Sequence, residues 1–530
     1  MPDRPNRLDR REFLRSTVLT GAAGGALAAG ALDAVAARAA KRTRKTRPAK
    51  PPRKTQHGFR EINDGSLKGC LELLGQFQKP PKVMFDVYAA AYKPLAAKRE
   101  ATFAEVADDP DFRRICGKNG IDLLGGPMLG SLGDSGVGVW VRTVRPAKVE
   151  VAVTVDGAER KFGPVATTAE SDLSAVVKVT GLKPATTYPY RVRVDGKPVA
   201  IPDGAAITTA PRSDAPGKVR IVFGSCYHRW GLGNHMQAAA MLARKPAALL
   251  AIGDIAAQDR NNKLGMHRAD YLLRDFRPAW QRLSASLPVY AAWDDHDYFD
   301  NDRWGIPKGF TDADRRGVRG VFVQSWANPM YGFGDEGGGV FCRTRIGPCD
   351  VILVDHRYFR TGDKTAGALL GREQMKWLKG QLLACKGPFI VLSCGTMWSD
   401  HISNGKDSWG RWDPEGREEL FQFIEDHRIG GVLLISGDRH GARGVTIPRP
   451  SGFRFYEFEP ASLGGRVGPA PWGKDKDNQF LGLSNRYAFG EFTIDAARAD
   501  PTVTFRLVGD DGEIIHELKL TRSQLTPKGQ

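Results

Sequence analysis

Long hydrophobic runs are missing from the 530-residue sequence: beyond its first 40 residues, no segment approaches the ~18 uninterrupted apolar residues of a membrane span. We therefore expect no stable membrane-spanning helix. Apolar side chains as such are not scarce, because they make up 41% of the sequence. A chain of this length and composition can bury a large core in two or three domains.

Cysteine is scarce and odd in number, with seven residues in the chain. If Cys226 is a metal ligand, the other six either pair or remain thiols. Cys342 and Cys349 flank a hairpin turn expected at residues 345–348. They are the best candidates for a disulfide.

Acidic residues are missing from residues 41–54, which hold eight basic residues and three prolines. Such a composition cannot bury a core, so a flexible, basic, Pro-rich linker is predicted at residues 41–57. Residues 1–57 hold fourteen Lys and Arg but four acids, so they carry +10 of the formal net charge of +17. The remaining +7 suits anionic small substrates, and no nucleic-acid partner is expected.

Residues 16–32 lack charge altogether and are rich in Ala and Gly. They follow the paired Arg10 and Arg11, and the small residues 34–36 come after them. This order is typical of a twin-arginine signal peptide, here residues 1–40. We expect export by the twin-arginine translocase to the periplasm or the cell exterior. The alternative is a chance Arg pair before an Ala-rich helix.

The rest of the chain divides by its apolar pattern. Residues 58–120 contain helix-like stretches. Residues 121–211 hold short alternating strands at regular spacing, which indicates a β-sandwich. Within them, residues 180–188 resemble the corner signature of fibronectin type III-like domains. From residue 218 to 522, strands alternate with helices, which predicts an α/β domain.

Metal-type ligands follow four of the expected strands. Ligands in open α/β sheets bind at such strand ends. Acids and an imidazole crowded into residues 294–297 repel one another and need a cation or a donor network. A thiolate with carboxylates and imidazoles suits a transition metal beside a harder cation. The strands at 219–223, 248–252, 287–292 and 431–435 are followed by Cys226, by Asp254, by Asp294 to Asp297, and by Asp438 and His440.

Four motifs together resemble the alkaline phosphatase D (PhoD-like) family of metallophosphoesterases. They are Gly-Ser-Cys at 224–226, Gly-Asp at 253–254, Trp-Asp-Asp-His-Asp at 293–297 and Ser-Gly-Asp-Arg-His at 436–440. Residues 355–360 and 370–378 also match, and the resemblance covers about residues 121–510. It implies a metallophosphoesterase-type α/β/β/α sandwich at residues 218–522. A small fibronectin III-like β-sandwich domain at 121–211 would precede it.

The resemblance implies two metal ions, usually iron and calcium. Cys226 and His440 would bind the first, which is usually ferric iron in this family. Asp254 would bridge both ions. Asp295 and Asp438 would bind the second, which is usually calcium.

The resemblance also implies catalytic roles. Asp254 would help to hold a bridging hydroxide nucleophile, and His296 would protonate the leaving group. Arg357 and Arg439 are candidate phosphate clamps, because guanidinium matches phosphate with two hydrogen bonds. For each arginine, a buried salt bridge is an equal alternative.

One departure from the family pattern concerns the first metal. The family usually has a tyrosine ligand three residues after the bridging aspartate, and this sequence has Ala257 there. Asp259 or a water molecule is the candidate replacement, and the identity of the first metal stays open. His228 and His235 follow Cys226 closely, but a lone loop histidine is more often a hydrogen-bonding or surface residue. His401 follows another strand end and is a weaker candidate.

These observations predict an exported, metal-dependent phosphatase or phosphodiesterase. It would hydrolyse phosphate esters by a two-metal mechanism with a bridging hydroxide. Diesters such as phospholipid or teichoic-acid linkages are one possible preference. The alternative from another class is a non-catalytic binding protein for phosphate-containing polymers, whose metal site has degenerated with the loss of the tyrosine.

Overall fold

A computed structural model of the protein describes residues 57, 60–363, 365–399, 408–468 and 477–528. The predicted signal peptide, residues 41–56 of the predicted linker and His401 lie outside these residues. Of the helices within them, none has the length and apolar character that crossing a bilayer requires.

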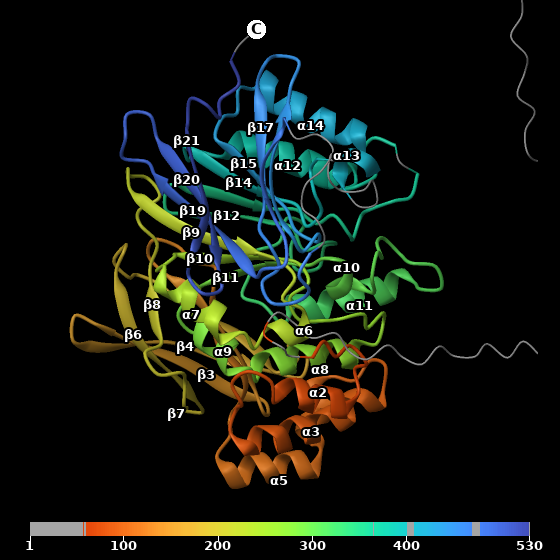
Figure 1. Ribbon diagram of the computed structural model, residues 1–530. Helices are drawn as coiled ribbons and strands as arrows, with labels where there is room; N and C mark the ends of the chain where they lie inside the picture. Colours follow the sequence, from red (N-terminus) through yellow and green to blue (C-terminus); the bar gives the residue numbers. More distant parts are fainter. Residues whose placement is uncertain (1–56, 58–59, 364, 400–407, 469–476, 529–530) are drawn as a thin grey trace, which may run out of the picture. The chain divides into compact units, whose positions relative to one another are not determined.

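Two β-sheets packed face to face form the centre of the α/β part (Figure 1). In the first sheet, β9, β10 and β11 run parallel, so their carboxyl ends lie at one edge. Its order is β11-β10-β9-β19-β20-β21, with β9 Lys218–Gly224, β10 Ala248–Ile252, β11 Val289–Ala292, β19 Ala488–Asp495, β20 Thr502–Gly509 and β21 Ile514–Thr521.

The second sheet has seven strands, and β13, β14, β15 and β17 are parallel neighbours in it. Its order is β12-β13-β14-β15-β17-β16-β18, with β12 Cys342–Ile346, β13 Cys349–Leu353, β14 Phe389–Ser393, β15 Val432–Ile435, β16 Ala442–Pro448, β17 Arg454–Glu459 and β18 Gln479–Leu483.

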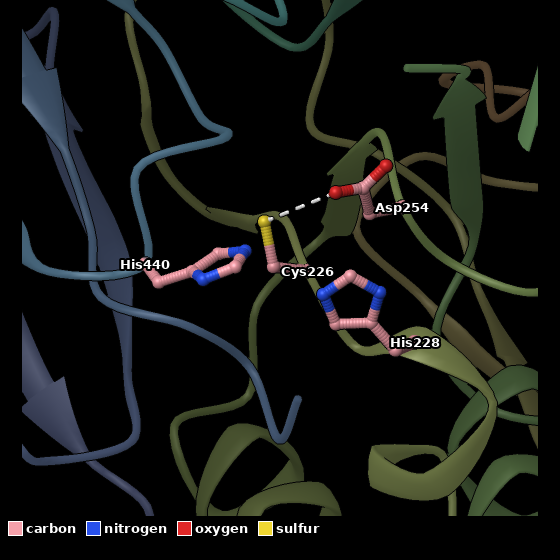
Figure 2. A group of neighbouring side chains, drawn as sticks. All are labelled: Cys226, His228, Asp254 and His440. Atoms are coloured by element: carbon pink, nitrogen blue, oxygen red, sulfur yellow. Dashed lines mark hydrogen bonds between the residues drawn. The ribbon is translucent and has the colours of Figure 1, made fainter. Parts of the chain in front are cut away.

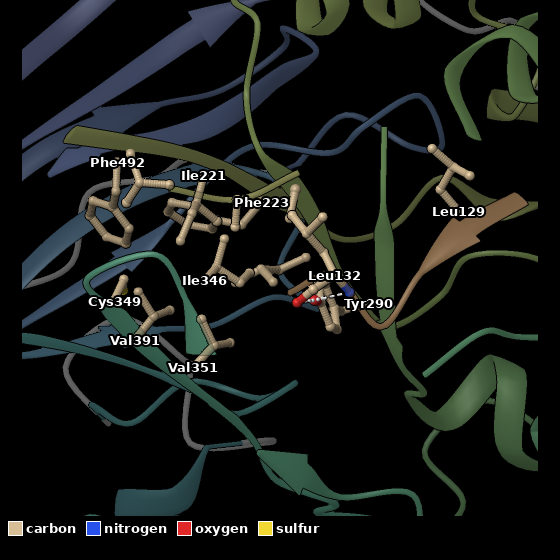
Figure 3. Packing of buried hydrophobic residues seen from close by; sticks show 14 of the residues in the cluster. Leu129, Leu132, Ile221, Phe223, Tyr290, Ile346, Cys349, Val351, Val391 and Phe492 are labelled. Carbon is tan, nitrogen blue, oxygen red and sulfur yellow. Dashed lines mark hydrogen bonds between the residues drawn. The ribbon is translucent and has the colours of Figure 1, made fainter. Parts of the chain in front are cut away.

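Side-chain alternation along the strands builds three layers of core. Ile221 and Phe223 of β9 point toward Val351 and Val391 of the other sheet (Figure 3). Val222 between them points to the opposite face, where helices cover it. Both faces of these strands are thus buried, which explains their nearly continuous apolar sequences.

Helices cover the outer face of each sheet, as the sequence predicts. The helices α12 Arg372–Ala384 and α14 Pro414–Asp426 bury Leu378 and Leu420 against the second sheet (Figure 1). The first sheet packs with α7 His235–Ala243, α8 Leu264–Asp275, α9 Pro278–Ser284 and α11 Asp312–Val323.

The helical stretch between β10 and β11 consists of two helices, α8 and α9. Pro278 is the first residue of α9, and Arg277 before it is extended at φ −77° and ψ 119°. A proline disfavours the helical conformation in the preceding residue, so the helix breaks there.

Two antiparallel sheets form the region before the α/β part, and their buried faces share a core. This region packs on the first sheet, because the Tyr290 hydroxyl donates to the carbonyl of Leu132 and accepts from its N–H (Figure 3). The fibronectin III likeness and the domain boundaries stay predictions. The sheets are β1-β2-β5 and β4-β3-β6-β7, with β8 beside β6; the strands are β1 Leu123–Gly130, β2 Val137–Thr143, β3 Ala147–Val155, β4 Ala158–Thr167, β5 Ser174–Val179, β6 Thr187–Val194, β7 Lys197–Pro198 and β8 Ala206–Thr208.

The helix-like stretches before residue 120 form four helices that pack on α8. Val87 and Leu95 of α3 share a buried cluster with Leu272 and Phe276. The Tyr88 hydroxyl donates to the carbonyl of Ala269 at 3.1 Å. The four helices are α2 Leu67–Leu74, α3 Lys82–Ala97, α4 Phe103–Asp108 and α5 Pro110–Asn119.

The disulfide expected between Cys342 and Cys349 does not form, and both residues are thiols. The hairpin turn lies where expected, because Ile346 pairs with Cys349 across it. Cys342, however, pairs with Leu353. The two cysteines are therefore offset by four residues along the hairpin, about 13 Å, far beyond disulfide reach.

Asp172 joins three parts of the fold. Its side chain is 2% exposed and accepts from Arg268 Nε of α8 at 2.9 Å and from Arg142 of β2 at 3.4 Å. It also accepts from the backbone N–H of Phe103, the first residue of α4. One carboxylate thus pairs with two buried arginines and accepts the first N–H of one helix.

We expect Asp172→Asn to lower the free energy of unfolding by about 3 kcal/mol, because it leaves buried arginines without their counter-ion. Asn tolerates the left-handed backbone at this position, where φ is 55°. Urea unfolding followed by circular dichroism measures the change.

The matched control is Asp156→Asn, which also has a left-handed backbone, at φ 50°. Asp156 pairs with exposed Lys183, and its side chain is 71% exposed. The control should unfold like the wild type. Equal stability of the two variants would contradict the role given to Asp172.

Candidate metal and catalytic centre

Four loops from both sheets converge at one site. The loops after β9, β10 and β11 leave the same edge of the first sheet, and the loop after β15 comes from the second. Two glycines permit the close approach. A Cβ on Gly253, whose φ is +110°, would lie 2.5 Å from Asp294 Cβ, and one on Gly437 would lie 2.5 Å from Ser225 Oγ.

The first group of donors is Cys226, His228, Asp254 and His440, whose ligand atoms all lie within 4.8 Å of one another (Figure 2). Cys226 Sγ lies 3.6 Å from Asp254 Oδ2. A thiol, two imidazoles and a carboxylate are ligands typical of transition metals and zinc.

The second group of donors is made only of carboxylates. Asp254, Asp294, Asp295 and Asp438 each offer an oxygen within 4.8 Å of the others. An all-oxygen, anionic group of this kind suits a hard cation such as calcium. Asp254 belongs to both groups, so its carboxylate lies where two cation sites would meet.

The backbone is strained at these residues. Left-handed φ angles are unfavourable for non-glycine residues and cluster at functional sites. The donors in this conformation are Cys226 at φ 59°, His228 at 47°, Asp254 at 55°, Asp438 at 72° and His440 at 64°. This recurrence at five donor positions indicates that the loops are shaped by the site.

Burial governs the charges of the donors. Burial raises the pKa of the Cys226 thiol well above its usual value, and the Asp254 carboxylate raises it further. Burial also raises the pKa of Asp254 well above its usual value, and the nearby carboxylates of Asp295 and Asp294 add to the rise, against the effect of His296. Burial lowers the pKa of His440 to about 3. A neutral imidazole is the form that binds metals.

The residues present fit a pair of cations. Asp254 Oδ1, Asp294 Oδ2 and Asp295 Oδ1 are buried and have no hydrogen-bond partner within the described ranges. Buried carboxylate oxygens without partners are unfavourable, and positive ions held between them satisfy them.

Asp294 and Asp297 are partly balanced by the protein itself. Arg357 Nε and His356 Nε2 lie 2.6 and 2.8 Å from Asp294 Oδ1. Burial would raise the pKa of Asp294, but Arg357 and His356 hold it below its usual value. Asp297 accepts from the N–H groups of residues 255 and 256, both at 3.1 Å. It therefore fixes the loop that carries Asp254.

His296 has a charged partner at the rim of the site. Its Nδ1 lies 2.5 Å from Asp259 Oδ1, and Asn63 Nδ2 donates to Asp259 Oδ2 at 2.8 Å. Burial lowers the pKa of His296, but Asp254, Asp259 and Asp295 outweigh it and raise the pKa to about 11. Asp259 thus serves His296, and it is not part of the described donor groups around Cys226, where it was the candidate replacement for the missing tyrosine.

The two candidate phosphate clamps lie in different surroundings. The side chain of Arg357 is 1% exposed and lies against Asp294 and, at 3.6 Å, Asp295. The side chain of Arg439 is 17% exposed and lies 3.7 Å from Asp438, and its Nε is buried with no hydrogen-bond partner in the described part of the chain. Arg357 has the surroundings of a salt-bridge residue, and Arg439 those of an anion-binding one.

The structure brings together all the residues predicted to bind metal: Cys226, Asp254, Asp295, Asp438 and His440. It adds His228 and Asp294 to them, and it places a nitrogen of His296 within 4.8 Å of oxygens of Asp254 and Asp295. Sequence reasoning gave His228 a low weight and did not single out Asp294 from its acidic neighbours. His235, the other histidine of that stretch, starts α7 and has a ring contact with Phe77.

Comparison with known proteins gives a family. The family model PhoD-like phosphatase matches residues 225–504, more than half of the chain. A second model, a domain of unknown function (DUF7800), matches residues 121–212. A search of curated proteins found no match.

Two solved structures share the fold. One, described as PhoD, superposes with a TM-score of 0.62 at 18% sequence identity and covers 76% of this chain and 89% of its own. The other is the purple acid phosphatase PPD1 from yellow lupin (Lupinus luteus) seeds, with a TM-score of 0.51 at 12% identity, covering 75% of this chain and 74% of its own. The α/β fold is thus of the metallophosphoesterase type. The chain belongs to the PhoD-like phosphatase family and is a metal-dependent phosphoric ester hydrolase.

Proposed function

We propose that this protein is an exported phosphatase or phosphodiesterase that works with two cations at the described site. The observation that carries the proposal is the position of Asp254 in both donor groups. Cys226 and His440 would hold the first cation with Asp254. Asp295 and Asp438, with Asp294, would hold the second, and iron and calcium are the pair that the family resemblance implies.

When bound, such cations activate water near neutral pH and neutralise the charge of the phosphoryl oxygens. The protein's own side chains would bind the phosphate and protonate the leaving group. Arg439, whose side chain is 17% exposed beside Asp438, would bind a phosphoryl oxygen through its guanidinium. Because the nearby carboxylates raise the pKa of His296 to about 11, its imidazole carries a proton on each nitrogen. Nδ1 donates to Asp259, and the Nε2–H can give its proton to the departing alkoxide. His296 therefore acts as general acid and Asp259 positions it.

We expect Asp254→Asn and Asp438→Asn each to lower the turnover of an aryl phosphate ester by at least about 10³-fold. Each variant removes one anionic metal ligand, and with it several kcal/mol of transition-state stabilisation. Steady-state kinetics with each metal combination measures the loss. The control Asp156→Asn lies on the sandwich surface and should leave turnover unchanged. Wild-type turnover in either site variant would reject the two-cation proposal.

We expect Asp259→Asn to slow the hydrolysis of an alkyl phosphate about 10- to 100-fold, since a general acid contributes roughly 10²–10⁴-fold and the variant only weakens its positioning. An aryl phosphate with a good leaving group needs no proton, so its kcat should fall much less. The ratio of the two kcat values is the measurement. Asp300→Asn is the control, because Asp300 bonds Asn261 and the N–H of Asn301. Equal slowing of both esters would contradict the role of His296.

The substrate range follows from the same site. Nothing in the donor groups requires a monoester, so diesters such as phospholipid or teichoic-acid linkages stay candidates. Rates on matched mono- and diesters decide between them. Membership of a hydrolase family argues against a non-catalytic binding protein, and so does the full set of donors.

Export is proposed from the first 40 residues. Replacing both Arg10 and Arg11 by Lys should leave the full-length protein in the cytoplasm, because the translocase reads the arginine pair. Cell fractionation with immunoblotting measures this. Replacing Arg4 and Arg7 by Lys is the control. Normal export of the first variant would contradict twin-arginine export.

A further inference from the structure

We propose that His228 is a ligand of the first cation and that the set Cys226, His228, Asp254 and His440 selects a divalent ion, such as zinc, over ferric iron. The inference rests on the proposed two-cation function and assigns a residue that the family resemblance leaves out. Four observations carry it.

The backbone fixes His228 beside the other donors. The N–H of His228 donates to the carbonyl of Asp254 at 2.8 Å, and the N–H of Cys226 donates to the carbonyl of Gly253 at 3.0 Å. These two bonds tie the loop after β9 to the loop after β10. His228 also has the left-handed φ, 47°, that marks the other donors. In Figure 2 its ring lies beside Cys226, with one nitrogen turned toward it.

Hydrogen bonds select the metal-binding tautomer of His228. The Gln258 amide gives its NH₂ to Asp259 at 3.4 Å, so its oxygen faces His228 Nδ1 at 2.7 Å. Nδ1 must then carry the proton and donate to that oxygen. The lone pair is left on Nε2. A partner that fixes the second nitrogen is the usual arrangement for a metal-bound histidine.

The lone pair of His228 Nε2 accepts no hydrogen bond from the described residues, although the atom is buried. The ring is held on one face by Trp230, with centroids 4.8 Å apart and planes 15° from parallel. A core histidine that served packing alone would leave an acceptor unsatisfied, at a cost of about 1–3 kcal/mol. Binding a cation removes that cost.

The net charge of these four ligands determines which metal ion they prefer. A thiolate and a carboxylate supply two negative charges, and two imidazoles add none. Ala257 is buried and has only a methyl group where a phenolate would supply a third charge. Two negative charges balance a divalent ion, and sulfur with nitrogen ligands is the usual surrounding of zinc. Ferric iron would lack the third anionic ligand that a phenolate supplies.

The test compares two histidines of the same stretch. His228→Asn keeps a residue that tolerates the left-handed backbone, and His235→Asn is the control outside the donor group. Zinc affinity is measured on the full-length protein by competition with a chromophoric chelator, and bound metal is counted by mass spectrometry. We expect His228→Asn to lose more than about 100-fold in zinc affinity. This exceeds the loss expected when the changed residue only hydrogen-bonds to a ligand. His235→Asn should bind like the wild type.

A second measurement needs no variant. The wild-type protein is loaded with one equivalent of zinc and measured by X-ray absorption at the zinc edge. The spectrum should show two imidazoles and one sulfur around zinc. A single imidazole, or wild-type zinc affinity in His228→Asn, would overturn the assignment. Preference for ferric iron over zinc in competitive loading would overturn the selectivity.

A parallel measurement on Asp254→Asn separates this inference from the proposed function. If Asp254→Asn loses metal but His228→Asn does not, the two-cation site stands and His228 is not a ligand. If Asp254→Asn also retains both metals with wild-type affinity, the two-cation proposal itself fails.

Discussion

Repulsion among buried carboxylates is the constraint around which this structure is built. Asp254, Asp294 and Asp295 place oxygens within 4.8 Å of one another. Like charges this close in a poorly solvated space oppose folding unless positive groups balance them. Arg357 and His356 balance Asp294. The N–H of residue 302 bonds one oxygen of Asp295. Oxygens on all three aspartates still lack partners within the described residues, and bound cations would supply the missing positive charge.

The helices before residue 120 support the loops that carry the donors. Arg229 follows His228 directly and pairs with Asp270 of α8 at 2.7 Å. It also donates to Cys70 of α2 at 2.8 Å. Asp270 accepts from the N–H of Gln258, the residue that orients His228. A chain of buried polar contacts therefore runs from α2, through Arg229 and Asp270, to the donor loops.

Much of the fold and of the site could be predicted, for a clear physical reason. Parallel strands buried on both faces read as apolar runs, and their carboxyl ends meet at one edge. The residues after β9, β10, β11 and β15 could therefore be grouped from sequence alone. The layered α/β architecture followed from the same alternation of strands and helices.

Some features could not be predicted from the sequence, because they depend on local backbone geometry that leaves no periodic pattern of residues. His228 lies two residues after Cys226, but its direction is set by a left-handed turn and by the Gln258 amide. The Cys342–Cys349 pairing failed because spacing near a turn does not give strand register.

The anionic character of the donors also constrains the order of binding. A phosphate ester is negatively charged, and so are the acids that surround the site. Arg357, which is nearly inaccessible, has its charge committed to Asp294 and Asp295. Arg439 is then left as the more exposed guanidinium of the two candidates. Arg439 and a protonated His296 would not offset all of these carboxylates once they are ionised, so an ester would be repelled from the bare donors. In the proposed mechanism, recognition of the substrate would therefore depend on prior binding of cations, and the acids proposed to hold the metals would be part of the substrate site.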